Sequence, residues 1–250
     1  ALNEKKYGLV WEEHSEKVDE MLEHNIPIFI EDETRKITAN EDEPYNFLLE
    51  GDNLHSLKLL EKTHKGKIDV IYIDPPYNTG NKDFIYDDSF VDKTDGYAHS
   101  KWLSFMEKRL NIARELLSDD GVIFISIDDN EQAQLKLLCD NIFGEDNFIG
   151  EYIKQSKVGG GNDSKFIVKE HEYCECYSKN INAVSPMNIK HSEEYLKRYK
   201  EIDENGRYFW DTFARPGLKN PIVYDIIAPD GSKIHNGWIR SEERFLREYS

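Results

Sequence analysis

The sequence predicts an α/β fold built on a doubly wound parallel sheet, and three observations support this prediction. Short apolar segments rich in β-branched residues alternate with segments of helical periodicity between residues 46 and 153. The 250 residues are 38% hydrophobic, which is enough for a substantial core. Glycine and proline, at 15 and 8 residues, are too few for a collagen-like or disordered chain. A region of mixed α and β structure is expected to follow the sheet.

The first part of the chain contains one predicted helix and a polar linker. Residues 9–24 place apolar side chains at helical spacing, so we expect an amphipathic helix there. Residues 31–44 are polar and strongly acidic, which is typical of a linker. We therefore place residues 1–45 outside the main domain.

Strand–helix alternation begins at Asn46 and ends near residue 155. An apolar run predicts a strand at Phe47–Glu50, and Asp52 is placed to cap the helix expected at 53–62. Ile68–Ile73 is apolar on both faces, as expected of a central parallel strand. The remaining predicted elements are a hairpin or loop at 81–92, a helix at 99–117, a turn at Gly121, a strand at 122–127, a helix at 130–143 and a strand at 148–153.

The alternation stops after residue 155, and we place a domain boundary there. Gly159-Gly160-Gly161 predicts a flexible loop, and His171–Ser178 alternates as a strand does. Cys174 and Cys176 share one face of that strand, and no second ligand pair at zinc spacing occurs, so we expect no metal site. The other expected features are a capped helix at 192–201, irregular β structure with turns at Asn205-Gly206, Asp230-Gly231 and Asn236-Gly237, and a helix at 241–249.

Charge and cysteine content indicate the class of partner and the compartment. The formal net charge of −17 by itself argues against a nucleic-acid partner. That charge is uneven, however, at −9 over residues 1–50, −8 over 51–150 and 0 over 151–250. No segment approaches the ~18 apolar residues that span a bilayer, and no signal-peptide pattern opens the chain. Three cysteines without a secretory signal favour a cytoplasmic location and no membrane partner.

The most informative motif is Asp74-Pro75-Pro76-Tyr77, directly after the apolar strand Ile68–Ile73. Ligands of open α/β sheets bind beyond the carboxyl ends of the strands. Asp74 and the Pro75 carbonyl are hydrogen-bond acceptors. Pro76 restricts the backbone, and Tyr77 presents a flat aromatic face. Two acceptors beside an aromatic plane suit a planar ring that carries an exocyclic amine.

Five segments between residues 50 and 145 form a larger pattern around this motif. They are Glu50-Gly51-Asp52-Asn53, Lys67–Gly80, His99–Met106, Asp120–Glu131 and Phe143-Gly144-Glu145. In order and spacing they resemble the β group of N6-adenine DNA methyltransferases, notably the modification (Mod) subunits of type III restriction–modification systems. The resemblance implies a Rossmann-like methyltransferase sheet, incomplete in this chain. It also implies a catalytic core at 46–155 and a target-recognition region at 156–250.

The resemblance implies methyl transfer from S-adenosylmethionine to N6 of an adenine that is flipped out of double-stranded DNA. It assigns Asp74, Pro75, Pro76 and Tyr77 to the target base, with Asp74 also meeting the cofactor. It assigns Asp52 and Asn53 to the cofactor, although Asp52 can also serve only as a helix cap. The alternative functions are N4-cytosine methylation and a non-catalytic DNA-binding module. A restriction (Res-type) subunit and a second copy of the chain are candidate protein partners.

Basic residues of the last hundred positions are candidate DNA contacts. They are Lys154, Lys157, Arg207, Arg215 and Arg240. In the β group, a Phe-x-Gly-x-Gly loop that holds S-adenosylmethionine follows the recognition region, and these 250 residues contain no such sequence. We therefore expect this chain by itself to bind the cofactor weakly and to transfer little methyl.

Overall fold

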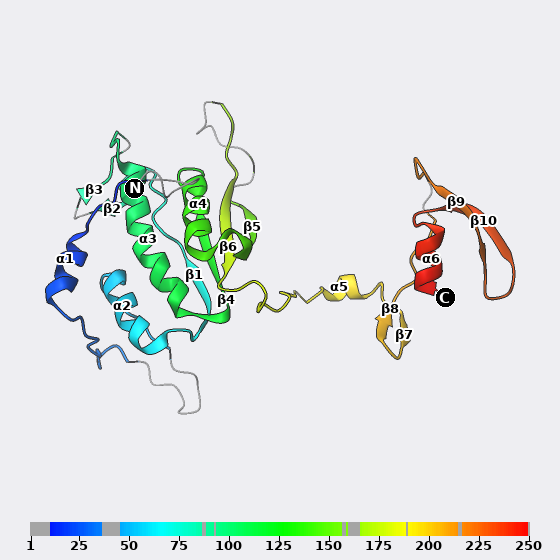
Figure 1. Cartoon of the computed structure of the whole chain (residues 1–250), viewed down its shortest axis with the longest axis horizontal. Coiled ribbons are helices and arrows are strands. Elements are labelled where there is room, and N and C mark those ends of the chain that lie inside the picture. The colour runs from blue at the N-terminus through cyan, green and yellow to red at the C-terminus, as the bar shows by residue number, and fades with distance from the viewer. Residues whose placement is uncertain are drawn as a thin grey trace, which may run out of the picture. The chain divides into compact units, whose positions relative to one another are not determined.

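The chain forms two compact units in the computed structural model, which describes residues 11–36, 46–86, 89–92, 94–156, 159, 166–188, 190–214 and 217–249 (Figure 1). The first unit ends at Pro186 and the second begins at Met187. This division comes after strand β6 (His171–Ser178), not near residue 155 as the sequence indicated. The reason is that β6 pairs with two strands of the first unit, and the loss of strand–helix alternation could not reveal that pairing.

A four-stranded mixed sheet in the order β1-β4-β6-β5 is the centre of the first unit. β1 (Ile68–Ile73) and β4 (Leu117–Ile127) are parallel, whereas β6 is antiparallel to both β4 and β5 (Phe148–Gln155). β1, β4 and β5 therefore run in one direction, and the prediction of an α/β fold with an incomplete sheet is confirmed. Within the described residues β1 is an edge strand, so the expected central position is wrong. Its Val70 and Tyr72 side chains are 59% and 64% exposed.

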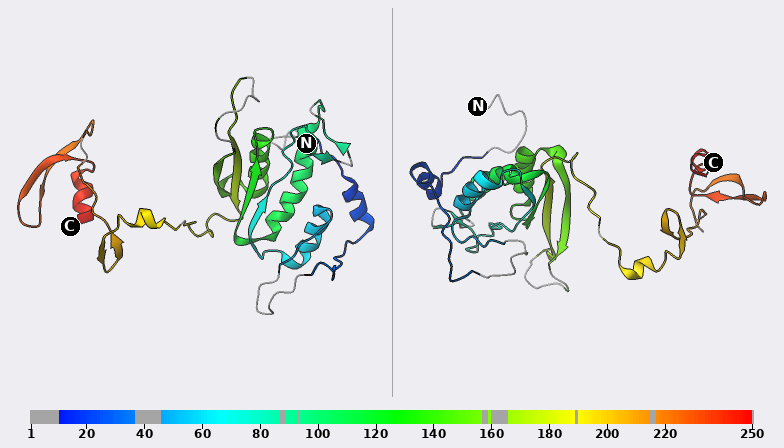
Figure 2. Two further views of the ribbon diagram at one scale, coloured as in Figure 1. Left: turned by 180° about the vertical axis from the view of Figure 1, so that it is seen from behind. Right: turned by 90° about the horizontal axis from the view of Figure 1, so that it is seen from below.

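Three helices cover one face of this sheet, as the right-hand view of Figure 2 shows. They are α2 (Asn53–His64), α3 (Ala98–Leu116) and α4 (Gln132–Phe143), close to the predicted bounds. The apolar stripe of α3, including Trp102 and Leu110, packs on the fully buried Ile123 and Ile125 of β4. Because the helices and strands bury these side chains together, the end of β1 is attached to a rigid layer. None of the described helices is long and apolar enough to cross a membrane.

The amino-terminal helix is shorter than its periodicity suggested. α1 spans Lys17–His24, and residues 11–16 are not helical. Glu16 and Asp19 form a capping box that begins the helix at this point. Before it, the His14 backbone N–H donates to Ser104 Oγ of α3 at 3.1 Å, which holds this segment in a non-helical course. Residues 9–10 of the predicted helix and 37–44 of the predicted linker lie outside the described residues.

The strand expected at Phe47–Glu50 does not form. A strand needs a hydrogen-bonded neighbour, and residues 47–50 pair with none of the described strands, although β1 has a free edge. Phe47 and Leu48 are accordingly 67% and 94% exposed. The expected hairpin at 81–92 is present as β2 (Ile85–Tyr86) and β3 (Ser89–Phe90).

Gly121 lies inside β4 and not in a turn, because β4 begins at Leu117. A Cβ atom on this glycine would lie 2.8 Å from the Ile68 carbonyl oxygen.

Gly121→Ala should therefore lower the free energy of unfolding by about 1–3 kcal/mol, as overpacking does. Denaturant titration measures this loss. Gly96→Ala is the matched control, since nothing lies within 4 Å of its added Cβ, and equal unfolding midpoints for the two variants would contradict the prediction.

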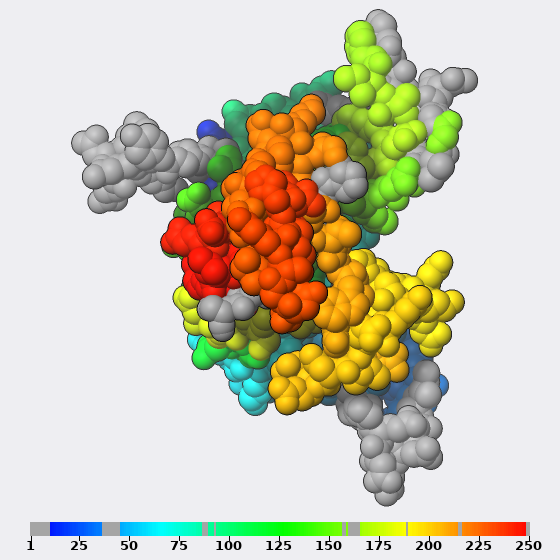
Figure 3. Space-filling model, turned by 90° about the vertical axis from the view of Figure 1, so that its right-hand side faces the viewer, coloured from blue at the N-terminus to red at the C-terminus, as the bar shows by residue number. Residues whose placement is uncertain are grey.

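The second unit, residues 187–249 as described, is small and rich in hairpins. Its elements are α5 (Glu193–Leu196), β7 (Glu201–Asp203), β8 (Gly206–Tyr208), β9 (Ile222–Ile227), β10 (Lys233–Trp238) and α6 (Glu242–Tyr249). α6 packs beside the β9–β10 hairpin (Figure 3), where the Phe245 ring lies 6.5 Å from the Tyr224 ring of β9 between centroids. Asn236-Gly237 is not a turn, because both residues belong to the β9–β10 ladder. The predicted helix at 192–201 is also too long, since β7 begins at Glu201.

Candidate functional site

The Asp74–Tyr77 motif lies at the carboxyl end of β1. The neighbouring parallel strand β4 ends at Ile127 and is followed by a polar segment, Asp128–Glu131. Because parallel strands present their carboxyl ends at one edge of a sheet, both polar segments lie at the same edge. The structure thus places the motif where an open α/β sheet binds its ligands.

Two side chains fix the course of the loop that carries the Asp74–Tyr77 motif, which we call the motif loop. Trp102 of α3 is fully buried, and its indole Nε1–H donates to the Pro76 carbonyl oxygen at 2.6 Å. Asn78, at a left-handed φ of 56°, donates from Nδ2 to Glu131 Oε1 at 2.5 Å and to the Ala98 carbonyl at 3.3 Å. No hydrogen bond to the Pro75 carbonyl occurs within the described part of the chain, so that oxygen can accept one from a ligand.

Tyr77 and Asp74 border one open depression. Burial, followed by the neighbouring carboxylate of Asp74, raises the pKa of Tyr77, so its hydroxyl stays neutral at physiological pH. Asp74 is exposed and Tyr77 is half-buried. The depression is lined by Asp74, Pro75, Pro76, Tyr77, Thr79, Asp83, Lys154 and Glu172. An exposed acceptor beside a partly buried aromatic ring can bind a planar base that carries an amine.

Among the predicted DNA contacts that the structure describes, Lys154 is the one that lines this depression. It lies on β5, and its Nζ is 3.5 Å from Glu172 Oε2 of β6. Glu172 was missed in the sequence because the β5–β6 pairing that places it opposite Lys154 was not predicted. Asp83, which accepts from the Thr79 backbone N–H at 2.8 Å, was missed although it lies close to the motif in the sequence.

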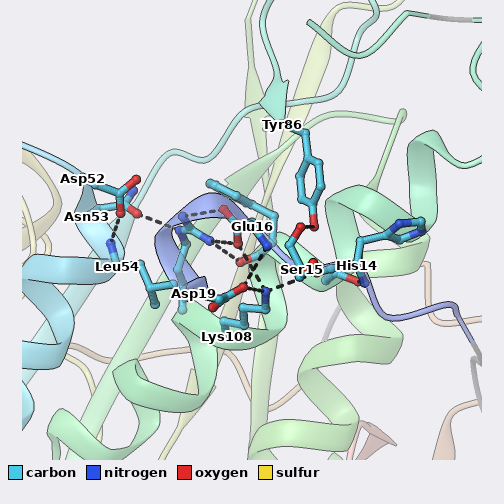
Figure 4. A network of polar contacts seen from close by, with 12 residues as sticks. His14, Ser15, Glu16, Asp19, Asp52, Asn53, Leu54, Tyr86 and Lys108 are labelled. Atoms are coloured by element: carbon cyan, nitrogen blue, oxygen red, sulfur yellow. Dashed lines mark hydrogen bonds and ion pairs between the residues drawn. The ribbon is translucent and has the colours of Figure 1, made fainter. Parts of the chain in front are cut away.

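Asp52 and Asn53 stand at the start of α2 (Figure 4). Asp52 Oδ1 accepts from the Leu54 backbone N–H at 2.8 Å, so the helix-cap role is confirmed. Asn53 Oδ1 accepts from Arg109 Nε at 2.7 Å, which leaves its amide N–H groups as donors for a ligand. The end of α2 leads into the start of β1. The start of α2, with Asp52 and Asn53, therefore lies towards the carboxyl end of β1.

Arg109 was not singled out from the sequence, yet it links Asn53 to the amino-terminal segment. Its two terminal nitrogens donate to the two carboxylate oxygens of Glu16 at 2.9 and 3.1 Å. Its guanidinium also lies 3.5 Å from the centre of the Phe105 ring. Lys108 and Asp19 form a second ion pair beside Glu16 (Figure 4). A buried arginine in a predicted amphipathic helix carries no sequence signal for a partner 93 residues away.

The other predicted DNA contacts are distributed differently. Arg207 lies on β8 of the second unit and is exposed. Arg240 follows β10, and its Nη1 forms an ion pair with Glu248 of α6. Lys157 and Arg215 lie outside the described residues, as do Gly160 and Gly161 of the predicted loop. The described residues that line the depression all belong to the first unit.

No group of three or more metal-ligating side chains occurs among the residues that the structure describes. Cys174 and Cys176 lie on β6, where the sequence predicted a strand, and they are free thiols. Burial raises the pKa of Cys176 to about 12, so this thiol stays protonated and apolar.

Comparison with known proteins decides the family. The family model described as DNA methylase (N6_N4_Mtase) matches residues 68–245. The chain belongs to this N6/N4 DNA methylase family. That membership agrees with the resemblance that the motifs indicated, and the matched range begins at β1 and includes the Asp74–Tyr77 motif.

Relatives of this DNA methylase chain include two type III restriction–modification Mod subunits. The EcoPI Mod subunit of Escherichia phage P1 is 36% identical over 244 residues, covering 86% of this chain and 37% of the relative. The EcoP15I Mod subunit of Escherichia coli is 32% identical, covering 93% of this chain and 45% of the relative. The chain thus spans less than half the length of these relatives. Among solved structures, the cytosine-N4-specific PvuII DNA methyltransferase has 17% identity and a TM-score of 0.37, covering 58% of this chain and 59% of that chain.

Proposed function

We propose that the complete protein transfers a methyl group from S-adenosylmethionine to N6 of an adenine in a specific DNA sequence, as the Mod subunit of a restriction–modification system. The observation that carries this proposal is the depression at the end of β1, where Asp74 and the Pro75 carbonyl stand beside Tyr77. Membership of the DNA methylase family and similarity to two Mod subunits support it.

The residues of the depression fit the chemistry of a flipped adenine. The N6 atom cannot be reached inside the base stack, so the base must leave the duplex. The ring then stacks on Tyr77, and the amine donates its two hydrogens to the Asp74 carboxylate and the Pro75 carbonyl. These bonds localise the nitrogen lone pair, which is otherwise delocalised into the ring. The nitrogen would then form its bond to the methyl carbon while the methyl–sulfur bond breaks, and the sulfur would keep that electron pair as a neutral thioether. The methylated nitrogen would afterwards lose one proton to solvent water.

The chain also offers groups that suit the cofactor. When bound, S-adenosylmethionine supplies a methyl group on a positively charged sulfur. Asp52 and Asn53 would hold the adenosine part, through the free Asp52 oxygen and the Asn53 amide N–H groups. Asp74 would meet the cofactor's amino group. The depression has three carboxylates, from Asp74, Asp83 and Glu172, and this acidity suits a cationic cofactor.

DNA contact is proposed for Lys154 at the depression and for Lys157, Arg207, Arg215 and Arg240. The neutral charge of residues 151–250, against the acidity of the rest, supports this assignment. We further propose that residues 187–250 take part in target recognition. A Res-type subunit and a second copy of the chain are the proposed protein partners, and the cytoplasm is the proposed location.

Nucleoside analysis tests this function. DNA methylated by the complete protein with labelled S-adenosylmethionine should yield N6-methyladenine after digestion. N4-methylcytosine as the product would support the alternative within the same family, since its exocyclic amine needs the same acceptors. Binding of DNA without any methylated nucleoside would support a non-catalytic module and contradict the proposed activity.

A further inference from the structure

Glu131 is a fully buried carboxylate at the edge of the sheet where the motif loop lies. It follows β4 and immediately precedes α4. The methyl-transfer chemistry proposed above gives this side chain no part. Its Oε2 atom accepts no hydrogen bond from any described residue, and burial raises its pKa. Such an unsatisfied buried oxygen costs about 1–3 kcal/mol, so its presence calls for an explanation other than stability.

The other oxygen of Glu131 joins three segments of the chain. Oε1 accepts from Asn78 Nδ2 at 2.5 Å and lies 2.7 Å from His99 Nδ1. Asn78 is adjacent to Tyr77, and its amide also donates to the Ala98 carbonyl at the start of α3. The motif loop, the first turn of α3 and the start of α4 therefore meet at one carboxylate oxygen.

The bond to Glu131 holds the side chain of Asn78, a residue with a left-handed backbone. Its φ of 56° lies in the left-handed region, which residues other than glycine rarely adopt. The direction of the Tyr77 ring and of the Pro75 carbonyl depends on where the chain turns at Asn78. A shift of the base-binding groups by about 1 Å can reduce a rate by about 10²-fold.

We infer that Glu131 is a positioning residue for methyl transfer, which acts through Asn78 to hold Tyr77 and the Pro75 carbonyl in place for the target base. This inference rests on the proposed function. It predicts that loss of Glu131 lowers the rate of the chemical step while cofactor binding at Asp52 and Asn53 stays intact. A residue that only stabilises the fold would instead lower the amount of folded, cofactor-binding protein.

The test compares Glu131→Ala and Glu131→Gln in the complete protein. Glu131→Ala should reduce kcat about 10–100-fold, as expected for a misplaced reactive geometry. Its calorimetric stoichiometry and dissociation constant for S-adenosylmethionine should stay at the wild-type values. Glu131→Gln keeps a carbonyl oxygen that can accept from Asn78, so it should retain most of the rate.

Glu175 provides a matched control. It is also 0% exposed with one unpartnered oxygen, but its Oε1 accepts from Gln132 at 2.8 Å, and none of its hydrogen bonds within the described residues reaches the motif loop. Glu175→Ala should therefore cost stability while the folded protein keeps its kcat. Asn78→Gly tolerates the left-handed backbone and removes the amide, so it should lower kcat as Glu131→Ala does.

Four results would overturn the inference. For Glu131→Ala they are a wild-type kcat, or a rate that falls only in proportion to the fraction of protein that binds cofactor. For Asn78→Gly the contradicting result is a wild-type kcat. For Glu175→Ala it is a loss of kcat equal to that of Glu131→Ala. If Glu131→Ala does not fold, Asn78→Gly decides between the outcomes. Failure of the proposed function is distinguishable from these results, because in that case the wild-type protein itself transfers no methyl group.

Discussion

Asp74→Ala should reduce the kcat of methyl transfer by the complete protein about 10²–10³-fold, comparable to the loss of one preorganised hydrogen-bonding group at a reacting centre. Asp74 is exposed at the end of β1 and faces the depression. Without its carboxylate, the amine of the target base loses one of two acceptors, and its lone pair returns to the ring. The rate at which labelled methyl groups are incorporated into DNA, at saturating cofactor, measures the effect.

Asp69→Ala is the matched control for Asp74. Asp69 is also an exposed carboxylate of the β1 segment, but it lies at the other end of the strand near Ser118. Both variants remove one negative charge, so only Asp74→Ala should lose activity. Tyr77→Ala should also be strongly impaired, since stacking of a base on an aromatic ring contributes about 1–3 kcal/mol. Methylation that survives both Asp74→Ala and Tyr77→Ala would contradict the assignment.

Arg109→Met should lower the free energy of unfolding by about 3–5 kcal/mol, because it leaves the Glu16 carboxylate buried without its main partner. The Arg109 side chain is 8% exposed and that of Glu16 is 10% exposed. The same change removes the hydrogen bond to Asn53 and the contact with the Phe105 ring. Chemical denaturation followed by circular dichroism measures the loss.

Arg114→Met on the same helix is the control for Arg109. Its side chain is 40% exposed, and it pairs with Glu115 at 3.6 Å. Loss of such a surface pair should cost less than about 1 kcal/mol. A double variant that also replaces Glu16 by Met removes the unpaired buried carboxylate. It should therefore recover part of the lost free energy of unfolding. Equal losses for Arg109→Met and Arg114→Met would show that the buried pair does not hold the amino-terminal segment.

The helices and strands of the first unit could largely be read from the sequence. α2, α3, β1 and β4 follow local periodicity, and the Asp52 cap acts between neighbouring residues. The exceptions depend on distant partners. Phe47–Glu50 has an apolar strand pattern but pairs with none of the described strands, and β5 is separated from β4 by β6, which comes later in the chain.

The sequence by itself determined the position of the Asp74–Tyr77 motif, because an apolar strand followed by two prolines places it at the end of that strand. The chemistry proposed for the motif came from its acceptors and aromatic ring together with the family resemblance. Only the tertiary structure decided what holds that motif. Asn78 and Glu131 are 53 residues apart, and Arg109 and Glu16 are 93 residues apart. Local periodicity reports which side of an element is buried, whereas a hydrogen bond between distant side chains depends on how whole elements pack. The groups proposed to bind the base are therefore neighbours in the sequence, whereas the side chains that hold them come from distant parts of the fold.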